Sequence, residues 1–234
     1  MAKLSAVDVT RIKSQISAIL SSHGRMSTAT ALSLLPVAAS HIEGKLYEAH
    51  VLAHIIEQLV TVEGCIITFI SGSRPMFKQK GGDINLHYPH FDVVDKAGNS
   101  IGKLLTDIYF HTLSYQKRTY SFRRKGDYHE LDIVLVKDGI TSGKPLPDEI
   151  RIAVECKNTK LHKHIIRELL GFRRELSYVV TTGTNPTGFS AWPAKDIAAN
   201  PASVHLFFTT HPRITDFEEN CRFFGTLLHS YKMK

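Results

Sequence analysis

Two short apolar segments, each interrupted by an acid, constrain the fold of this 234-residue chain more than any other feature. Residues 130–136 and 149–157 are rich in Val, Ile and Leu, and the turn-forming segment 138–148 separates them. Asp132 interrupts the first segment. The pattern predicts two neighbouring β-strands joined as a long hairpin.

The second segment separates polar from apolar side chains. Successive side chains of a strand point to opposite faces, so Glu155 and Lys157 are predicted to share one face, about 7 Å apart. The other face is predicted to be apolar and to carry Ile150, Ile152, Val154 and Cys156.

The hairpin also predicts which residues lie opposite each other. A hairpin symmetric about Gly143 and Lys144 pairs Asp132 with Glu155, with Cβ atoms about 5 Å apart. Two carboxylates at that distance repel unless a proton or a cation lies between them. A divalent cation such as magnesium prefers carboxylate oxygens. The pairing therefore predicts a cation site at this position.

A third acid lies on the clearest predicted helix, residues 42–61. On a helical wheel Glu48 falls in the apolar arc, in line with Leu52 and Leu59, so its carboxylate is expected to face inward and to need a partner. His50 and His54 fall on the opposite, polar face and are interpreted as surface histidines.

The remaining pattern completes the fold prediction. Helices are expected at 7–21, 27–35, 161–177 and 216–230, and further strands at 66–70, 90–94, 104–110, 118–123, 178–182 and 204–208. This order predicts an α/β fold with a central mixed, largely antiparallel β-sheet flanked by helices. Residues 1–40 are interpreted as a short N-terminal helical appendage and residues 41–234 as the main domain.

The arrangement of these acids resembles the PD-(D/E)xK superfamily of restriction-endonuclease-like nucleases. The likeness rests on Asp132, on Glu155 and Lys157 after the hairpin, and on Glu48 in an earlier helix, and it covers roughly residues 42–182. The chain departs from the pattern at Leu131, where the motif has proline.

The resemblance implies a role for each residue. Asp132 and Glu155 would bind one or two magnesium ions, for which manganese would substitute, and Glu48 and the main-chain carbonyl of Cys156 would complete the metal shell. Lys157 would orient the attacking water or stabilise charge on the phosphate. The implied activity is metal-dependent hydrolysis of phosphodiester bonds, in restriction, repair or defence against foreign DNA.

The charge of the chain favours a polyanionic partner. The formal net charge is +7 and the isoelectric point is about 9.3. DNA is expected in preference to RNA. Candidate phosphate-binding side chains on the helix after the motif are Lys163, Arg167 and Arg174, with Arg173 nearby. Arg74 and Lys78 in a glycine-rich loop are further candidates, as are Arg123 and Arg124.

Location and assembly are inferred from hydropathy, cysteine usage and the resemblance. No apolar stretch approaches the roughly 20 residues that span a bilayer. The three cysteines, Cys65, Cys156 and Cys221, are far apart and predicted to be reduced thiols of a cytoplasmic protein. Analogy with the superfamily suggests a homodimer or a regulatory protein partner.

Other interpretations of the same residues remain open. Asp132 and Glu155 could form a structural ion-pair network with Lys157. The fold could also be a catalytically inactive module that binds nucleic acid or a protein. A serine or cysteine hydrolase is disfavoured, because the chain has no nucleophile elbow.

Overall fold

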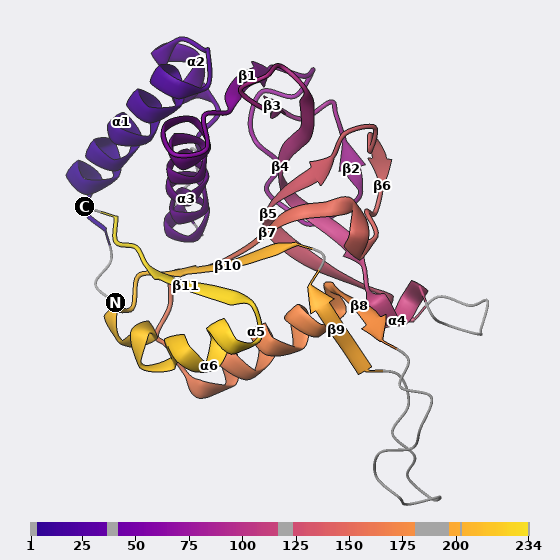
Figure 1. Ribbon diagram of the computed structural model, residues 1–234. Coiled ribbons are helices and arrows are strands. Elements are labelled where there is room, and N and C mark those ends of the chain that lie inside the picture. The colour runs from indigo at the N-terminus through magenta and orange to yellow at the C-terminus, as the bar shows by residue number, and fades with distance from the viewer. Residues whose placement is uncertain (1–3, 37–41, 117–123, 181–196, 202, 234) are drawn as a thin grey trace, which may run out of the picture.

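A computed structural model describes residues 4–36, 42–116, 124–180, 197–201 and 203–233, and Figure 1 shows their arrangement. The helices are α1 (Ala6–His23), α2 (Thr28–Ser33), α3 (Ile42–Thr61), α4 (Leu113–Gln116), α5 (Lys163–Glu175) and α6 (Glu218–Phe223). The strands are β1 (Ile66–Ile70), β2 (Ile84–Asn85), β3 (His90–Val94), β4 (Ser100–His111), β5 (Tyr128–Lys137), β6 (Ser142–Gly143), β7 (Ile150–Lys157), β8 (Ser177–Val180), β9 (Ile197–Pro201), β10 (Val204–Thr209) and β11 (Thr226–Ser230).

The main sheet is mixed and mostly antiparallel, which confirms the predicted fold class. Its strand order is β1-β3-β4-β5-β7-β10-β11. Neighbours from β1 to β7 are antiparallel, whereas β10 is parallel to both β7 and β11. Two smaller pairs, β2 with β6 and β8 with β9, lie outside it. β5 and β7, which carry the motif, are therefore interior strands.

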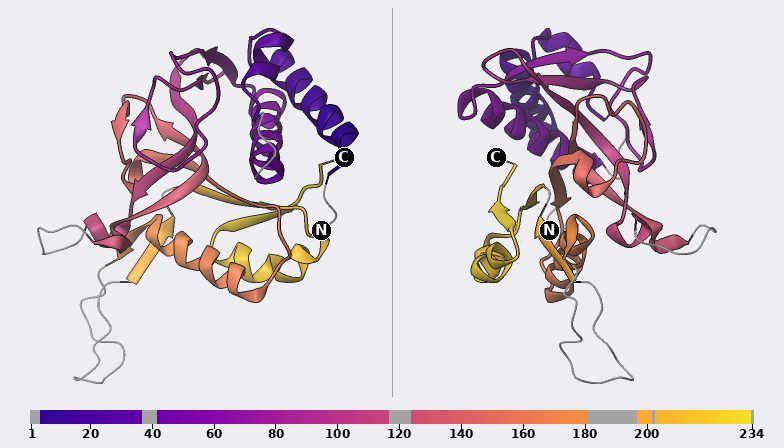
Figure 2. Two further views of the ribbon diagram at one scale, coloured as in Figure 1. Left: turned by 180° about the vertical axis from the view of Figure 1, so that it is seen from behind. Right: turned by 45° about the vertical axis from the view of Figure 1, so that its right-hand side comes forward.

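Helices cover both faces of the sheet. α3 lies on one side of β10 and β11, and α5 and α6 lie on the other side, as Figures 1 and 2 both show. α1 begins with a capping box between Ser5 and Asp8 and buries Ile12, Ile16 and Leu20 at four-residue spacing. These side chains share one hydrophobic cluster with α3 and the sheet. The domain boundary at residue 40 stays a prediction.

The β5–β7 pairing has the predicted hairpin register. Ile133 pairs with Val154 and Val134 with Ala153, which places Asp132 and Glu155 at the next position. A β-bulge follows at Val136, so Ile150 packs in the second hydrophobic cluster, on the side of α5. The prediction that Ile150 shares a face with Val154 was wrong, because a bulge reverses the alternation of faces.

The predicted C-terminal helix, 216–230, was also wrong. α6 ends at Phe223, Gly225 adopts a left-handed backbone with φ of 73°, and β11 follows. The glycine reverses the chain, so that the apolar residues after it pair with β10 rather than continuing the helix. The strand predicted at 118–123 lies outside the described residues. Among those described, no helix is long and apolar enough to cross a membrane.

Candidate metal centre

Three carboxylates from three elements meet at one point. On β4 and β5, Thr106 pairs with Ile133 and Ile108 with Leu131, which places Asp107 opposite Asp132. Glu48 comes from α3, and one oxygen from each of the three acids lies within 4.8 Å of the others. We call Glu48, Asp107 and Asp132 the acidic triad. This group could hold a metal ion.

Asp107 has an unusual backbone. Its φ is 54°, in the left-handed region, within an otherwise extended strand. Such a residue costs on the order of 1–3 kcal/mol unless its surroundings hold it, and strained residues gather at functional sites. The side chain is 1% exposed, and its Oδ2 finds no hydrogen-bond partner among the described residues. Buried oxygens without a partner are rare, and this one adds to the spacing of the three acids as a second feature expected of a ligand site.

Lys45 is the cation that faces the triad. Its Nζ donates to Asp107 Oδ1 at 2.5 Å and to Glu48 Oε2 at 2.6 Å. Lys45 precedes Glu48 by three residues on α3, so both side chains point the same way. The lysine thereby joins the helix to strand β4.

Asp132 and Glu155 lie where strands β5 and β7 stop pairing. The N–H of Cys156 donates to Asp132 Oδ2 at 2.6 Å, which fixes that carboxylate. Glu155 is buried, and its Oε2 forms an ion pair with Lys157 Nζ at 3.3 Å. Its other oxygen, Oε1, is buried with no partner in the described part of the chain. The structure thus brings Asp132 together with Glu48 and Asp107, and leaves Glu155 beside the triad with Lys157.

Burial and mutual repulsion disfavour the charged forms of these acids. Burial, then Asp132 and Asp107, raise the pKa of Glu48 to about 8. Burial raises the pKa of Asp107 to about 7, although Lys45 opposes the shift. Burial raises the pKa of Asp132 against the pull of Lys157, and burial together with Asp132 raises the pKa of Glu155. Burial removes part of the hydration of these carboxylates, and the neighbouring cations do not fully compensate for it.

The lysines respond in the opposite sense. Burial alone would lower the pKa of Lys45, but Asp107 and Glu48 raise it above its ordinary value. Burial likewise opposes the raised pKa of Lys157, which Glu155 and Asp132 produce. Both side chains are therefore ammonium ions at neutral pH. When all four acids are ionised, they carry two more negative charges than these two ammonium groups neutralise. One divalent cation would balance that excess.

The predicted phosphate-binding residues lie in several places. Lys78 is half-buried near Asp107 and Glu130, and its Nζ donates to the carbonyl of Asp83 at 2.8 Å. Arg74 is exposed, with its guanidinium 5.9 Å from the centre of the Tyr88 ring. Arg124 is exposed at the start of a short 3-10 helix, Lys125–Asp127, and Arg123 lies outside the described residues. Lys78 is thus the member placed close to the triad.

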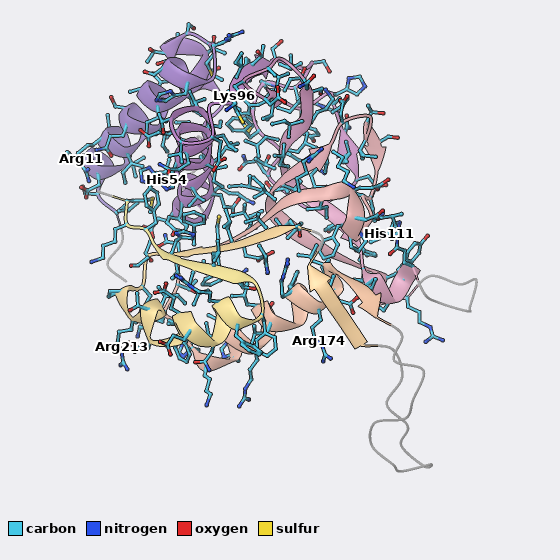
Figure 3. All side chains as sticks on the ribbon, viewed as in Figure 1. Arg11, His54, Lys96, His111, Arg174 and Arg213 are labelled. Carbon is cyan, nitrogen blue, oxygen red and sulfur yellow. The ribbon has the colours of Figure 1, made fainter. Side chains whose placement is uncertain are left out.

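The helix α5 presents its cations to solvent. Lys163, Arg167 and Arg174 are all exposed, and Figure 3 shows Arg174 on the side of α5 away from the sheet. Arg173, which was expected near this stripe, is buried, and it donates to the carbonyls of Ser203 and Phe224. Phosphate binding by the exposed residues stays a prediction.

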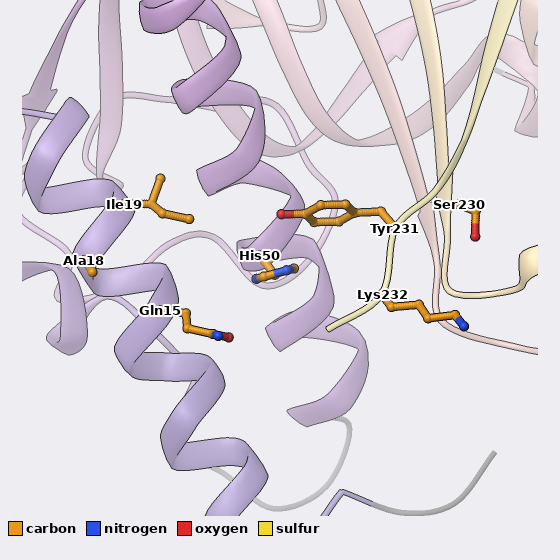
Figure 4. Close-up of a pocket in the computed structure, with 7 residues that line it drawn as sticks. All are labelled: Gln15, Ala18, Ile19, His50, Ser230, Tyr231 and Lys232. Atoms are coloured by element: carbon orange, nitrogen blue, oxygen red, sulfur yellow. The ribbon is translucent and has the colours of Figure 1, made fainter. Parts of the chain in front are cut away.

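His50 is not a surface histidine, and His54 is half-buried. His50 is 6% exposed, and both imidazole rings stack on Tyr231, with ring centres 4.8 and 4.5 Å away. The helical wheel assigned them to a polar face, but α1 and the end of the chain cover that face. A pocket opens beside His50 between α1 and Tyr231 (Figure 4), and none of the acids described above lines it. We call His50, His54 and Tyr231 the histidine–tyrosine cluster.

Sequence reasoning missed two residues of the centre, Asp107 and Lys45. Asp107 interrupts the apolar run of 104–110 in the same way that Asp132 interrupts 130–136, and that signal was present in the sequence. Lys45 gave no comparable signal, because a lysine one turn before a glutamate is common on helix surfaces.

Comparison with models of known protein families, with curated proteins and with solved structures finds no match for this chain.

Proposed function

We propose that this chain is a metal-dependent nuclease of the PD-(D/E)xK kind, which hydrolyses phosphodiester bonds of DNA with magnesium or manganese. The observation that carries the proposal is the charge of the buried centre. Four carboxylates face the ammonium groups of Lys45 and Lys157 there, and Glu130 and Lys78 nearby add one charge of each sign. Asp107 and Glu155 each keep a buried oxygen without a partner among the described residues. Nothing in ordinary structural packing requires such an arrangement.

The residues present fit a magnesium ion. Magnesium binds oxygen ligands and is usually held by a few carboxylates, with water and phosphate completing its shell. Glu48, Asp107 and Asp132 would hold it, and Glu155 and the carbonyl of Cys156 are further candidate ligands. Asp107 takes a place that the superfamily resemblance had not assigned. When bound, such an ion activates water and neutralises charge on phosphate.

The remaining groups have roles that follow from their contacts. The Cys156 N–H holds Asp132 in one orientation, which preorganises the centre. Glu155 anchors Lys157, whose side chain is 36% exposed and can contact a substrate. An ammonium there would stabilise negative charge that builds on the phosphate during attack. Lys78 and the exposed cations of α5 would hold the substrate backbone.

The basic net charge supports a nucleic-acid substrate rather than a small acidic one. We extend the proposal to a cytoplasmic enzyme that acts as a homodimer or under control of a protein partner, by analogy with the superfamily.

Cleavage assays test the proposal. Plasmid, linear duplex, single-stranded DNA and RNA would be incubated with the wild type, Asp132→Ala and Lys157→Ala, with magnesium, manganese or a chelator. Asp92→Ala and Lys103→Ala are matched controls, because this pair forms a 2.5 Å contact between β3 and β4 outside the triad. We expect metal-dependent cleavage that only the first two substitutions abolish. DNA binding without cleavage by the wild type would instead favour the inactive binding module.

A further inference from the structure

Lys45 lies where a metal ion would contact the triad. Its Nζ is within 2.6 Å of oxygens from both Glu48 and Asp107, and these acids are two of the three that could hold the ion. Its four-carbon stem carries a flexible point charge, and the side chain is 22% exposed rather than fully enclosed.

An ammonium and a divalent cation cannot share these oxygens without strong repulsion. Magnesium–oxygen bonds are about 2.0–2.1 Å long, so an ion on the same oxygens would lie within a few ångströms of Nζ. In this partly buried site like charges at such a distance are poorly screened. An ion on the unpartnered Oδ2 of Asp107 would also lie close to Nζ, because both oxygens belong to one carboxylate, so the ammonium opposes binding of the ion.

We propose that Lys45 is a built-in cation of the triad, which holds Glu48 and Asp107 together in the metal-free protein and is displaced by the divalent ion. Lys45 then competes with the metal and sets its affinity. The inference rests on the metal centre of the proposed function, but it concerns binding and not cleavage.

The contacts of Lys78, Lys103 and Lys157 distinguish this role from an ordinary salt bridge. Lys78 lies near Asp107, but its Nζ donates to the carbonyl of Asp83. Lys157 pairs with Glu155, which is outside the triad, and Lys103 pairs with the single carboxylate of Asp92. Lys45 instead bridges two triad members that are far apart in the sequence. A helix-surface pair would engage Glu48 alone.

Calorimetric titration with manganese ion alone, at one fixed pH, tests the inference. We would compare the wild type with Lys45→Met, Lys45→Gln and Lys45→Arg, and use Lys103→Met as the control of similar burial. The two neutral substitutions should tighten manganese binding by about tenfold or more, the low end of what one neighbouring charge does to the proton affinity of a carboxylate. Lys45→Arg, which keeps the charge, should stay close to the wild type, as should Lys103→Met.

Each outcome decides between clear alternatives. Tighter binding by Lys45→Met or Lys45→Gln supports the inference, and binding by these variants when the wild type binds no manganese supports it most strongly. Equal or weaker binding by both neutral variants overturns it and leaves the nuclease proposal standing, because the wild type still binds. Absence of binding by every variant removes both. Lys45→Gln keeps a hydrogen-bonding side chain, so the test survives if Lys45→Met fails to fold.

Discussion

Helix α3 buries two polar groups of different kinds. Near its start, Lys45 and Glu48 enter the acidic triad with Asp107 and Asp132. Within the next two turns, His50 and His54 stack on Tyr231 in the histidine–tyrosine cluster. The two groups share one helix and one hydrophobic core. They differ in whether their buried side chains carry charge.

The histidines avoid charge. Burial lowers the pKa of His50 to about 4 and also lowers that of His54, so both are neutral rings that pack like aromatic residues. The acids cannot do this completely, because Lys45 and Lys157 favour their charged forms. The comparison indicates that the first group packs as part of the core, whereas the second keeps buried charges, as the proposed metal centre requires.

The largest expected effect is on activity, from Asp107→Asn. Asparagine has the same shape and also tolerates a left-handed backbone, so the fold should persist. It lacks the negative charge that a metal ligand needs. We expect the rate of magnesium-dependent cleavage to fall by about 100-fold or more, with an unchanged circular dichroism spectrum.

Asp92→Asn is the control for this change, since Asp92 forms an ion pair with Lys103 outside the triad. A cleavage rate for Asp107→Asn close to that of the wild type would show that Asp107 is not a ligand, and that its strained backbone has another cause.

The second effect is on stability, from Tyr231→Ala. The substitution removes the ring that both histidines stack on, and it opens a hole beside α3. We expect the free energy of unfolding to fall by about 2 kcal/mol, as for loss of a half-buried aromatic side chain. Denaturant unfolding measures this. Cleavage per folded molecule should not change, and a large loss of activity would mean that the two groups on α3 are coupled.

A smaller effect of opposite sign is expected from Glu48→Gln in the metal-free protein. Because the pKa of Glu48 is raised to about 8, its stabilising contribution is complete below its unfolded pKa and is lost as the pH rises through 8. Glutamine removes this loss, so the unfolding free energy should increase by about 1 kcal/mol above pH 8 and change little at pH 5. Thermal unfolding at both pH values measures it. Equal effects at the two values would contradict the assignment of the cost to the Glu48 charge.

The sequence predicted the hairpin half of the centre because its constraints are local. Alternation along β7 and the symmetry of the connection placed Asp132 beside Glu155, and the observed register agrees. Cys156 was expected in the core and is buried there. The bulge that moves Ile150 was not predictable, because a one-residue insertion leaves no mark in an apolar run.

The positions of Asp107, His50 and His54 were not predicted, because they depend on which helices and strands pack against each other. Asp107 lies beside Asp132 because β4 pairs with β5. The long connection between these two strands made that pairing hard to predict. His50 and His54 were assigned to solvent because a helical wheel contains no information about a third element. In the structure α1 and the residues after β11 cover that side of α3.

The smallest expected effect tests this burial directly, through His54→Phe. Burial lowers the pKa of His54 although Glu57 opposes the shift, so its contribution to stability is complete above the unfolded value of about 6.5 and is lost as the pH falls through the folded pKa. Phenylalanine keeps the contact with Tyr231 and cannot be protonated. The melting temperature of His54→Phe should therefore decline less than that of the wild type between pH 7 and pH 5. His164→Phe, on the exposed surface of α5, controls for loss of one imidazole. If the two variants show the same decline, His54 is accessible to protons in the folded chain, and the contrast between the two groups on α3 fails at that residue.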